Sequence, residues 1–254
     1  MNYSAENSLQ SFVDRLTCRS ILTEGEKQAV LSLPTHLVKV RDRQDFVHIN
    51  EHVTYSSFIA SGLAGRFGQT ASGARQFTAF HIPGDMVDLH AAVRPIGLGG
   101  LTALCDTTIL RVPHAEIRIL AARFPALAEA FWRDSLLDSA ILMQWVINVG
   151  RRDARTRIAH AICEMSIRYG RDREVLSKFD FPVTQEQLAD ATALTAVHVN
   201  RSLKALRETG IVDLSRGRVH IHDWRALAKT GDFDPNYLIA DTKPERQKRL
   251  LSQS

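Results

Sequence analysis

The stretch PVTQEQLADATALTAVHVNRSLKALRETGIVDLSRGRVHIH, residues 182–222, contains the pattern that decides the fold. Thr184 followed by Gln187 is typical of a capping box at the start of a helix. Thr195 is placed to cap a second helix, which Gly210 would end. Two short helices joined by a tight turn, with polar side chains near the start of the second, indicate a helix-turn-helix.

The residues after the second helix predict the wing of a winged helix-turn-helix. Ile211–Leu214 and Arg218–Ile221 read as two short strands, joined by a turn at residues 215–217. We therefore expect a small hairpin with Arg216 and Arg218 near its tip.

The second helix has one apolar side and one polar side. Val199, Leu203 and Leu206 are spaced to face inward. The polar side carries groups that suit the major groove of DNA, where Arg pairs with guanine and Asn with adenine. Hydroxyl groups, His and the N–H groups at helix starts can donate to phosphates. The residues predicted to contact DNA are Thr184, Gln185, Thr195, Ala196, Val197, His198, Asn200, Arg201, Lys204, Arg216 and Arg218.

The charge distribution agrees with a polyanionic partner. Residues 151–254 hold 19 Lys and Arg against 14 Asp and Glu, whereas the first 150 residues hold 13 against 14. The excess positive charge therefore lies in the part that contains the helix-turn-helix. A winged helix can also serve protein contacts, and this alternative stays open.

One long helix is predicted over residues 125–149, PALAEAFWRDSLLDSAILMQWVINV. A helix this apolar has two surfaces to cover. One line of apolar residues runs through Leu137, Ile141, Trp145 and Val149, and a second line runs beside it. The helix is either a central core helix or one that packs on the β unit with one side and on a second copy with the other. The residues expected at the interface between two copies are Leu136, Ala140, Met143 and Ile147.

The N-terminal part predicts a β unit preceded by helical sequence. Residues 6–33 have a helical pattern, with Leu9, Phe12 and Leu16 on one face. From residue 36 to residue 112, short apolar or alternating runs are separated by turn-forming stretches. This spacing indicates an antiparallel sandwich or barrel, so the chain belongs to the α+β class.

Several classes of protein are excluded by composition. Three distant Cys and no CxxC exclude a disulfide scaffold and a Cys-type zinc site. No apolar run is long enough to span a membrane, and the N-terminus does not resemble a secretory signal, so we expect a cytoplasmic protein. His81, Asp85, Asp88 and His90 lie close in sequence, but no metal-binding spacing supports them as ligands. Since no nucleophile motif, P-loop or dinucleotide fingerprint is present, we expect neither an enzyme nor a metal or other cofactor.

The order of β unit, long apolar helix, hinge and winged helix-turn-helix resembles the Crp/Fnr family of bacterial transcription regulators. The stretches that carry the resemblance are FHIPGDMVDLH (80–90), RRDARTRIAHAI (151–162) and the helix-turn-helix segment 183–212. It implies a double-stranded β-roll sensor domain like a cyclic-nucleotide-binding domain, and a homodimer formed by the long helix. It also implies an inverted-repeat site in double-stranded DNA and RNA polymerase as a partner.

The resemblance also implies a role for individual residues of the second helix. Base-reading positions of the family fall on Ala196, Val197, Asn200 and Arg201, of which Arg201 matches a guanine-reading Arg. The expected domains are a β-roll with N-terminal helices over 1–124, a dimerisation helix and hinge over 125–150, a winged helix-turn-helix over 151–240 and a polar tail over 241–254.

The sensor segment departs from the cyclic-AMP-binding members of the family. Leu89 stands where those members have a Glu that meets the ribose, and the loop at residues 96–100 offers neither Arg nor Ser to the phosphate. Because a cyclic monophosphate without a charged partner is costly to remove from water, we expect an effector other than cyclic AMP, if one exists. A regulator gated by a cyclic nucleotide remains the alternative. The residues expected around the effector are Gly84, Asp85, Val87, Asp88, Leu89 and Arg94.

Overall fold

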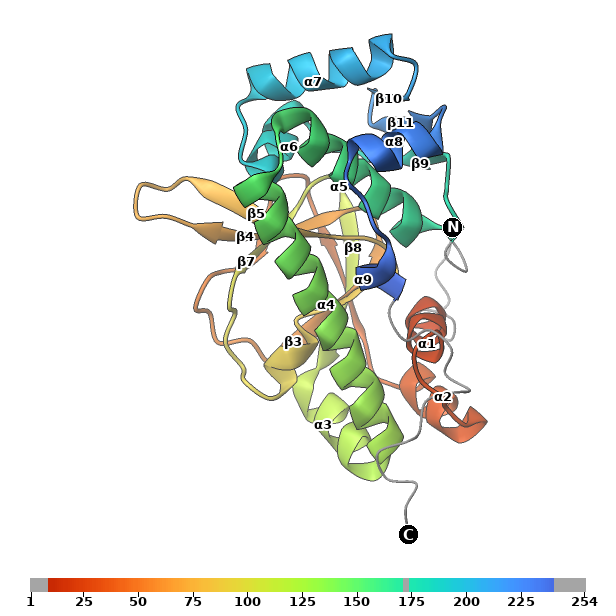
Figure 1. Ribbon diagram of the computed structural model, residues 1–254. Helices are drawn as coiled ribbons and strands as arrows, with labels where there is room; N and C mark the ends of the chain where they lie inside the picture. The colour runs from red at the N-terminus through yellow and green to blue at the C-terminus, as the bar shows by residue number, and fades with distance from the viewer. Residues whose placement is uncertain (1–8, 171–173, 240–254) are drawn as a thin grey trace. The chain divides into compact units, whose positions relative to one another are not determined.

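The computed structural model describes residues 9–170 and 174–239 of the chain (Figure 1). The expected polar tail, 241–254, lies outside these residues. Within the described ranges, no helix combines the length and apolar composition that a membrane span requires.

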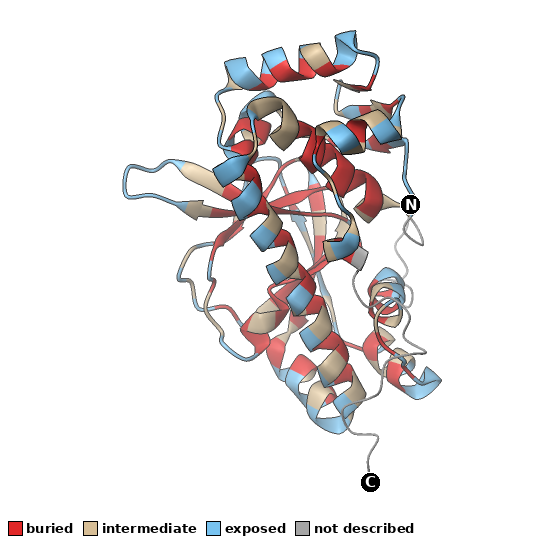
Figure 2. Cartoon of the chain, viewed as in Figure 1, coloured by how far each residue is buried: buried red, intermediate tan, exposed pale blue. Residues whose placement is uncertain are grey.

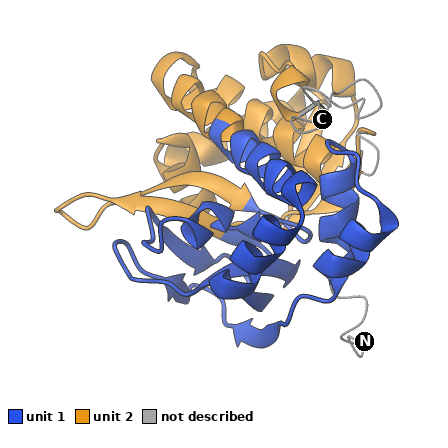
Figure 3. Ribbon diagram, turned by 90° about the horizontal axis from the view of Figure 1, so that it is seen from below, with its two compact units in different colours: residues 1–64, 81–139, 240–254 blue, residues 65–80, 140–239 orange. Residues whose placement is uncertain are grey.

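Contacts between residues divide the chain into two compact units (Figure 3). Unit 1 comprises residues 1–64, 81–139 and 240–254, and unit 2 comprises residues 65–80 and 140–239. Helix α4, Pro125–Arg151, is continuous and contributes residues to both units.

Unit 1 is built on antiparallel strands. Its four-stranded sheet has the order β1-β8-β3-β6, with bounds His36–Val40, Thr107–Pro113, Tyr55–Ser61 and Met86–Val87. Strand β2, Asp45–Val47, pairs with β7, Gly100–Ala103. Side chains from these strands form one buried apolar cluster that includes Val40, Ile59, Leu101 and Ile109. The antiparallel strands expected from residue 36 onward are confirmed.

The helical region expected at the N-terminus contains two helices. Helix α1 spans Gln10–Thr17 and α2 spans Glu24–Leu31. Helix α2 begins after Thr23 because a capping box forms there. The Thr23 side chain accepts from the backbone N–H of Glu26, and the Glu26 carboxylate accepts from the backbone N–H of Thr23 at 2.7 Å. Residues 6–8 of the expected stretch lie outside the described residues.

The helices of unit 1 share a second apolar cluster, and their buried faces are visible in Figure 2. Phe12 of α1 is fully buried, stacks on Phe131 of α4 and meets Phe58 of β3 edge-on. Helix α3, His114–Arg123, adds Ile117 and Leu120. A short 3-10 helix, η2 at Leu89–Ala92, follows β6.

A cluster of one cation and three carboxylates lies inside unit 1. The guanidinium of Arg15 contacts Asp85 in the turn before β6, and its Nε lies 2.6 Å from Oδ1 of Asp134 on α4. Asp138, one helical turn further along α4, is 3.9 Å from Nη2 of Arg15. The Asp85 and Asp134 side chains are 3% and 2% exposed, so these charges are largely removed from water. Burial raises the pKa of Asp134 above its usual range, although Arg15 opposes the shift.

Unit 2 contains two further strands and the whole winged part. Strands β4, Ala64–Gln69, and β5, Arg75–His81, precede the end of α4 in this unit. The remaining helices are α5 (Ala154–Tyr169), α6 (Gln185–Thr192), α7 (Ala196–Glu208), α8 (Trp224–Thr230) and α9 (Asn236–Ile239). A three-stranded sheet has the order β10-β11-β9, with bounds Val212–Ser215, Arg218–Ile221 and Lys178–Asp180. The expected helix pair and hairpin are confirmed, whereas β9, α8 and α9 were not anticipated.

Candidate nucleic-acid interface

The two helices of the helix-turn-helix are held by the caps that the sequence predicts. Thr184 accepts from the backbone N–H of Gln187 at 3.1 Å, and the Gln187 amide oxygen accepts from the backbone N–H of Thr184 at 2.8 Å. Thr195 accepts from the backbone N–H of His198 at 3.3 Å and so caps α7. Ala193, in the left-handed region with φ of 51°, ends α6 and completes the tight turn.

Helix α7 buries one side and presents the other to solvent. Val199 and Leu206 are fully buried, and Leu203 is 8% exposed, as the spacing predicts. Val197 is 74% exposed, so the outward side of α7 also carries an apolar side chain. Of the eleven residues expected to contact DNA, Thr184 and Ala196 are half-buried. The other nine are exposed: Gln185, Thr195, Val197, His198, Asn200, Arg201, Lys204, Arg216 and Arg218.

The polar side chains of this surface differ in how firmly they are held. Asn200 donates from its amide nitrogen to Gln185 at 3.4 Å, which orients both side chains. Lys204 lies 3.7 Å from Glu208 in an exposed pair. Arg201 is exposed, and no hydrogen bond or ion pair of its side chain is recorded among the described residues. Its five N–H donors are therefore available to an external acceptor.

The wing is a two-stranded hairpin with a two-residue loop. Ser215 pairs with Arg218, so Arg216 and Gly217 alone form the turn, with φ of 51° and 72°. Two consecutive left-handed residues match the twist of a tight hairpin. A Cβ at Gly217 would lie 3.2 Å from the Cα of Pro182, so the turn packs closely on the strand-to-helix segment. Arg218 pairs with Asp180 of β9 at 3.1 Å in an exposed ion pair, which is worth little by itself.

A single arginine ties the helix-turn-helix to the segment before it. Arg157 of α5 donates from Nε to the carbonyl of Arg152 at 2.8 Å. Its Nη1 donates to the carbonyls of Thr192 and Ala193 at 2.9 and 3.2 Å. Since Thr192 is the last residue of α6 and Ala193 is its C-cap, Arg157 satisfies carbonyls at the helix end where the turn begins.

A buried carboxylate holds the end of α4 on the winged part. Glu164 of α5 has no exposed surface and accepts from the indole N–H of Trp145 at 3.0 Å and from the hydroxyl of Tyr237 at 2.9 Å. Arg168 also pairs with Glu164, with its Nη1 3.1 Å from the Oε1 of the carboxylate. Burial, and then the charge of Glu164, raise the pKa of Tyr237, which keeps the hydroxyl proton available as a donor. This group was not expected from the sequence, although Glu164 lies beside the apolar face of α5 and was a visible signal.

Replacing Trp145 with phenylalanine is expected to lower the free energy of unfolding by about 1–3 kcal/mol, because a buried carboxylate loses a hydrogen-bond donor. Urea unfolding followed by circular dichroism measures the change. Trp224→Phe is the control, since Trp224 is half-buried and packs edge-on against Phe233. Equal losses in the two variants would contradict the role given to the Glu164 hydrogen bond.

The two apolar lines of α4 have different surroundings in the structure. Leu137, Ile141 and Trp145 are buried, with exposed fractions of 8% or less. The line expected to meet a second copy is largely exposed: Leu136 at 59%, Met143 at 64% and Ile147 at 40%, with Ala140 half-buried. Trp132 and Val146 extend this exposed apolar row.

The residues expected around an effector occupy one turn and the loop after it. Asp85 contacts Arg15 and accepts from the backbone N–H of Ile82 at 3.0 Å, so its carboxylate is used within the protein. Gly84 and Asp88 have positive φ, and Val87 is fully buried. Leu89 lines a pocket, and Arg94 is exposed. Among the described residues, no group of three or more His, Cys, Asp or Glu is placed to hold a metal ion.

Comparisons with known proteins agree with this geometry. Residues 156–230 match the model of the Crp-like helix-turn-helix domain. The chain is 25% identical over 171 residues to an anaerobic regulatory protein of Haemophilus influenzae, and the match covers 66% of each chain, about two thirds of that relative's length. It is 23% identical over 215 residues to the transcriptional activator FnrL of Cereibacter sphaeroides, covering 82% of this chain and 86% of the relative.

The solved structures that resemble this one show the same fold. FixK2 from Bradyrhizobium japonicum has a TM-score of 0.71 at 21% identity, covering 78% of this chain and 98% of that one. A mutant of CooA from Carboxydothermus hydrogenoformans has a TM-score of 0.61 at 15% identity, covering 78% and 88%.

The antiparallel β unit, the long helix and the winged helix-turn-helix together define a class, the DNA-binding transcription regulators with a Crp-type winged helix. Residues 156–230 form a Crp-like helix-turn-helix domain, and the chain is similar to regulators of the Crp/Fnr type.

Proposed function

We propose that the protein binds an inverted repeat in double-stranded DNA as a homodimer, with α7 in the major groove. The observation that carries the proposal is the exposed polar side of α7, which is anchored by buried Val199 and Leu206 and holds Asn200 and Arg201 outward. An α-helix fits the major groove, where Arg and Asn read guanine and adenine. The exposed wing residues Arg216 and Arg218 support contacts to the neighbouring phosphates.

The exposed apolar row of α4 supports the homodimer. Leu136, Met143 and Ile147 recur at helical spacing and remain accessible in a single chain. A second copy that packs its own row against this one buries both. Two recognition helices related by a twofold axis meet successive major grooves about 34 Å apart, so the DNA site is an inverted repeat.

Other parts of the proposal follow from the family. We take RNA polymerase as a partner of the protein at a promoter. We also take the cytoplasm as its location, since the proposed DNA site lies there. We give the protein no enzymatic activity, since known members of the family are transcription regulators. Gly84, Asp85, Val87, Asp88, Leu89 and Arg94 remain the proposed surroundings of an effector.

The test of DNA reading is Arg201→Ala, which is expected to weaken binding to the specific site by about 1–3 kcal/mol and to relax one base position. Fluorescence anisotropy on a site selected from a random DNA library, and on a scrambled sequence, measures both affinities. Arg207→Ala is the matched control, because Arg207 lies on the same helix but pairs with Asp213 at 2.7 Å. Equal losses on specific and scrambled DNA would mean that Arg201 touches only phosphate.

A salt titration separates DNA binding from a protein-interaction role. Affinity for DNA is expected to fall linearly with salt concentration on logarithmic axes, since Lys and Arg displace counterions. A flat response would contradict the proposed function and favour a protein partner for the winged domain.

A further inference from the structure

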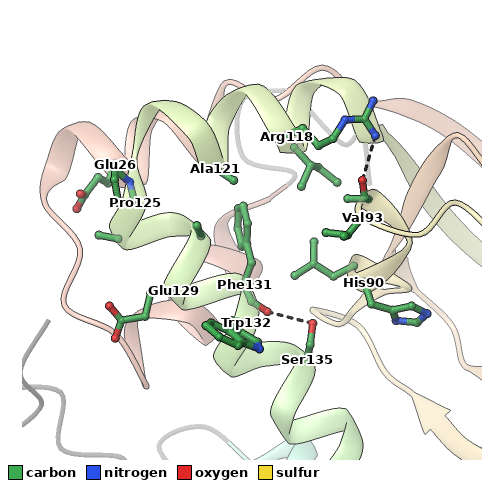
Figure 4. Close-up of a pocket in the computed structure, with 15 residues that line it drawn as sticks. Glu26, His90, Val93, Arg118, Ala121, Pro125, Glu129, Phe131, Trp132 and Ser135 are labelled. Carbon is green, nitrogen blue, oxygen red and sulfur yellow. Dashed lines mark hydrogen bonds between the residues drawn. The ribbon is translucent and has the colours of Figure 1, made fainter. Parts of the chain in front are cut away.

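Val197 has the largest exposed fraction, 74%, among the large apolar side chains recorded as exposed in the described part of unit 2. Most of the others lie on α4, in or beside the row that a second copy covers in the proposed homodimer: Leu142, Met143, Val146 and Ile147. The pocket of unit 1 drawn in Figure 4 is lined by Trp132 of that row, so the homodimer would cover this region as well. Val197 lies on α7, so the dimer interface does not account for it.

The geometry of α7 points Val197 away from the protein. Val199, two residues later, is fully buried, and at 3.6 residues per turn the two side chains lie about 160° apart around the helix axis. Arg201 and Lys204 follow Val197 by four and seven positions, so they continue its line along the helix, and both are exposed. When α7 lies in the major groove, this line faces the base edges.

The first turn of α7, which carries Val197, is held in place by its neighbours. Thr195 accepts from the backbone N–H of His198 at 3.3 Å, which fixes the start of the helix. Asn200, one turn after Val197, donates to Gln185 of α6 at 3.4 Å. A valine in a helix strongly prefers one rotamer, so its two methyl groups form a defined apolar surface.

The major groove offers a valine one kind of apolar group. Every base pair presents hydrogen-bond donors or acceptors there, and only thymine adds a methyl group, on C5. A valine placed against the other base edges removes polar atoms from water without bonding to them, which costs free energy. A valine placed against the thymine methyl group removes apolar surface from water on both sides, which is favourable. Both effects therefore favour thymine.

We propose that Val197 is a specificity-determining residue, which selects a thymine in each half of the DNA site by packing against the C5-methyl group. Asn200 and Arg201 lie one turn further along the same side of α7, so the thymine neighbours the base pairs that they read. The inference rests on the proposed function and deepens it, because it names the base and the chemical group that one residue recognises.

The experiment removes single methyl groups from the DNA. Each thymine of the selected site is replaced in turn by deoxyuridine in both halves of the repeat, and fluorescence anisotropy measures the affinity of the full-length protein. At one position the wild-type protein is expected to lose about 15-fold in affinity, or about fourfold for each methyl group, which is the usual effect of burying one such carbon.

Two variants connect this loss to Val197. Val197→Ala changes an exposed position and is expected to fold like wild type, which circular dichroism checks. In this variant the same deoxyuridine is expected to change affinity by less than about twofold, since the contact with the methyl group is gone. Val175→Ala is the matched control, because it deletes the same two methyl groups from another exposed valine of unit 2, outside α7. It is expected to show the full loss of the wild-type protein.

A methyl group added to another base tests the same contact in the opposite direction. With cytosine placed at the identified position, 5-methylcytosine is expected to strengthen wild-type binding about fourfold for each half-site. Val197→Ala is expected to bind the two DNAs equally.

Two results would overturn the inference while leaving the proposed function in place. The first is a protein that binds its inverted repeat but shows no thymine whose methyl effect depends on Val197. The second is an equal loss in Val197→Ala on thymine and deoxyuridine sites, which would mean that Val197 contacts another part of the DNA or another protein. Equal affinity of the wild-type protein for selected and scrambled DNA would instead refute the proposed function itself, so the two failures are distinguishable.

Discussion

Arg15→Met is expected to lower the free energy of unfolding by about 3–5 kcal/mol at neutral pH. The substitution keeps much of the aliphatic bulk of the side chain but removes the cation that Asp85 and Asp134 share. Both carboxylates are nearly inaccessible to solvent, so they would remain as uncompensated buried charges, which is the costly outcome for an ion pair. Chemical unfolding at several pH values measures the loss.

The pH dependence of that loss has a definite sign. The pKa of Asp134 is raised in the folded protein, so the folded state holds this proton more tightly than the unfolded chain does. Such a group adds stability as pH falls through its folded-state pKa. Removing Arg15 raises the pKa of Asp134 further, so the deficit of the variant is expected to narrow as the pH is lowered. A deficit that is constant with pH would show that lost packing, and not charge, is the cause.

A second substitution and a control sharpen this test. Arg15→Met combined with Asp134→Asn is expected to be more stable than Arg15→Met alone, because one of the stranded charges is gone. Arg41→Met, at an exposed position, is expected to change stability by no more than about 0.5 kcal/mol.

Met143→Glu is expected to separate the dimer into monomers at micromolar concentration. Met143 is 64% exposed in the single chain, so a glutamate there leaves the fold intact. In the proposed homodimer Met143 lies in the apolar interface, so each introduced carboxylate would be buried against apolar side chains of the other copy. We expect a loss of about 4 kcal/mol, or a thousandfold in the dimer dissociation constant. Analytical ultracentrifugation measures the mass, and affinity for an inverted repeat is expected to fall with it.

Gln144→Glu provides the matched control for this prediction. Gln144 is the next residue in the same turn, but it lies beside the apolar row and is half-buried in the single chain. The added charge is the same, and the dimer is expected to survive. If Met143→Glu sedimented as a dimer, the interface would lie elsewhere on the molecule.

The parts of the fold that follow local rules could be predicted from the sequence. The helix caps join residues three positions apart, so the sequence is enough to predict them. They are the bonds of Thr184 with Gln187 and of Thr195 with the N–H group of His198. The alternation of apolar and polar residues likewise predicted the main strands. The two apolar lines of α4 could also be predicted, because the apolar residues of each line repeat with the helical period. The structure buries one line and exposes the other.

The parts that depend on distant partners could not be predicted. Arg15 and Asp134 are 119 positions apart, and nothing near either residue indicates that they meet. Glu164 and Tyr237 are 73 positions apart and likewise have no local signal. The N-terminal helices expected before residue 33 are present, and the boundary between them is set by the capping box at Thr23, which was not used to predict it.

Arg157 bonds to two junctions of the chain, one just after the long helix and one between α6 and α7. The guanidinium of Arg157 donates to the carbonyl of Arg152, just after the long helix, and to the carbonyls of Thr192 and Ala193, at the bend between α6 and α7. Because one planar guanidinium bonds to both places, a rotation at one junction would strain the hydrogen bonds at the other. A lysine has a single ammonium in place of the planar fork, so it would keep the charge while loosening the mechanical coupling.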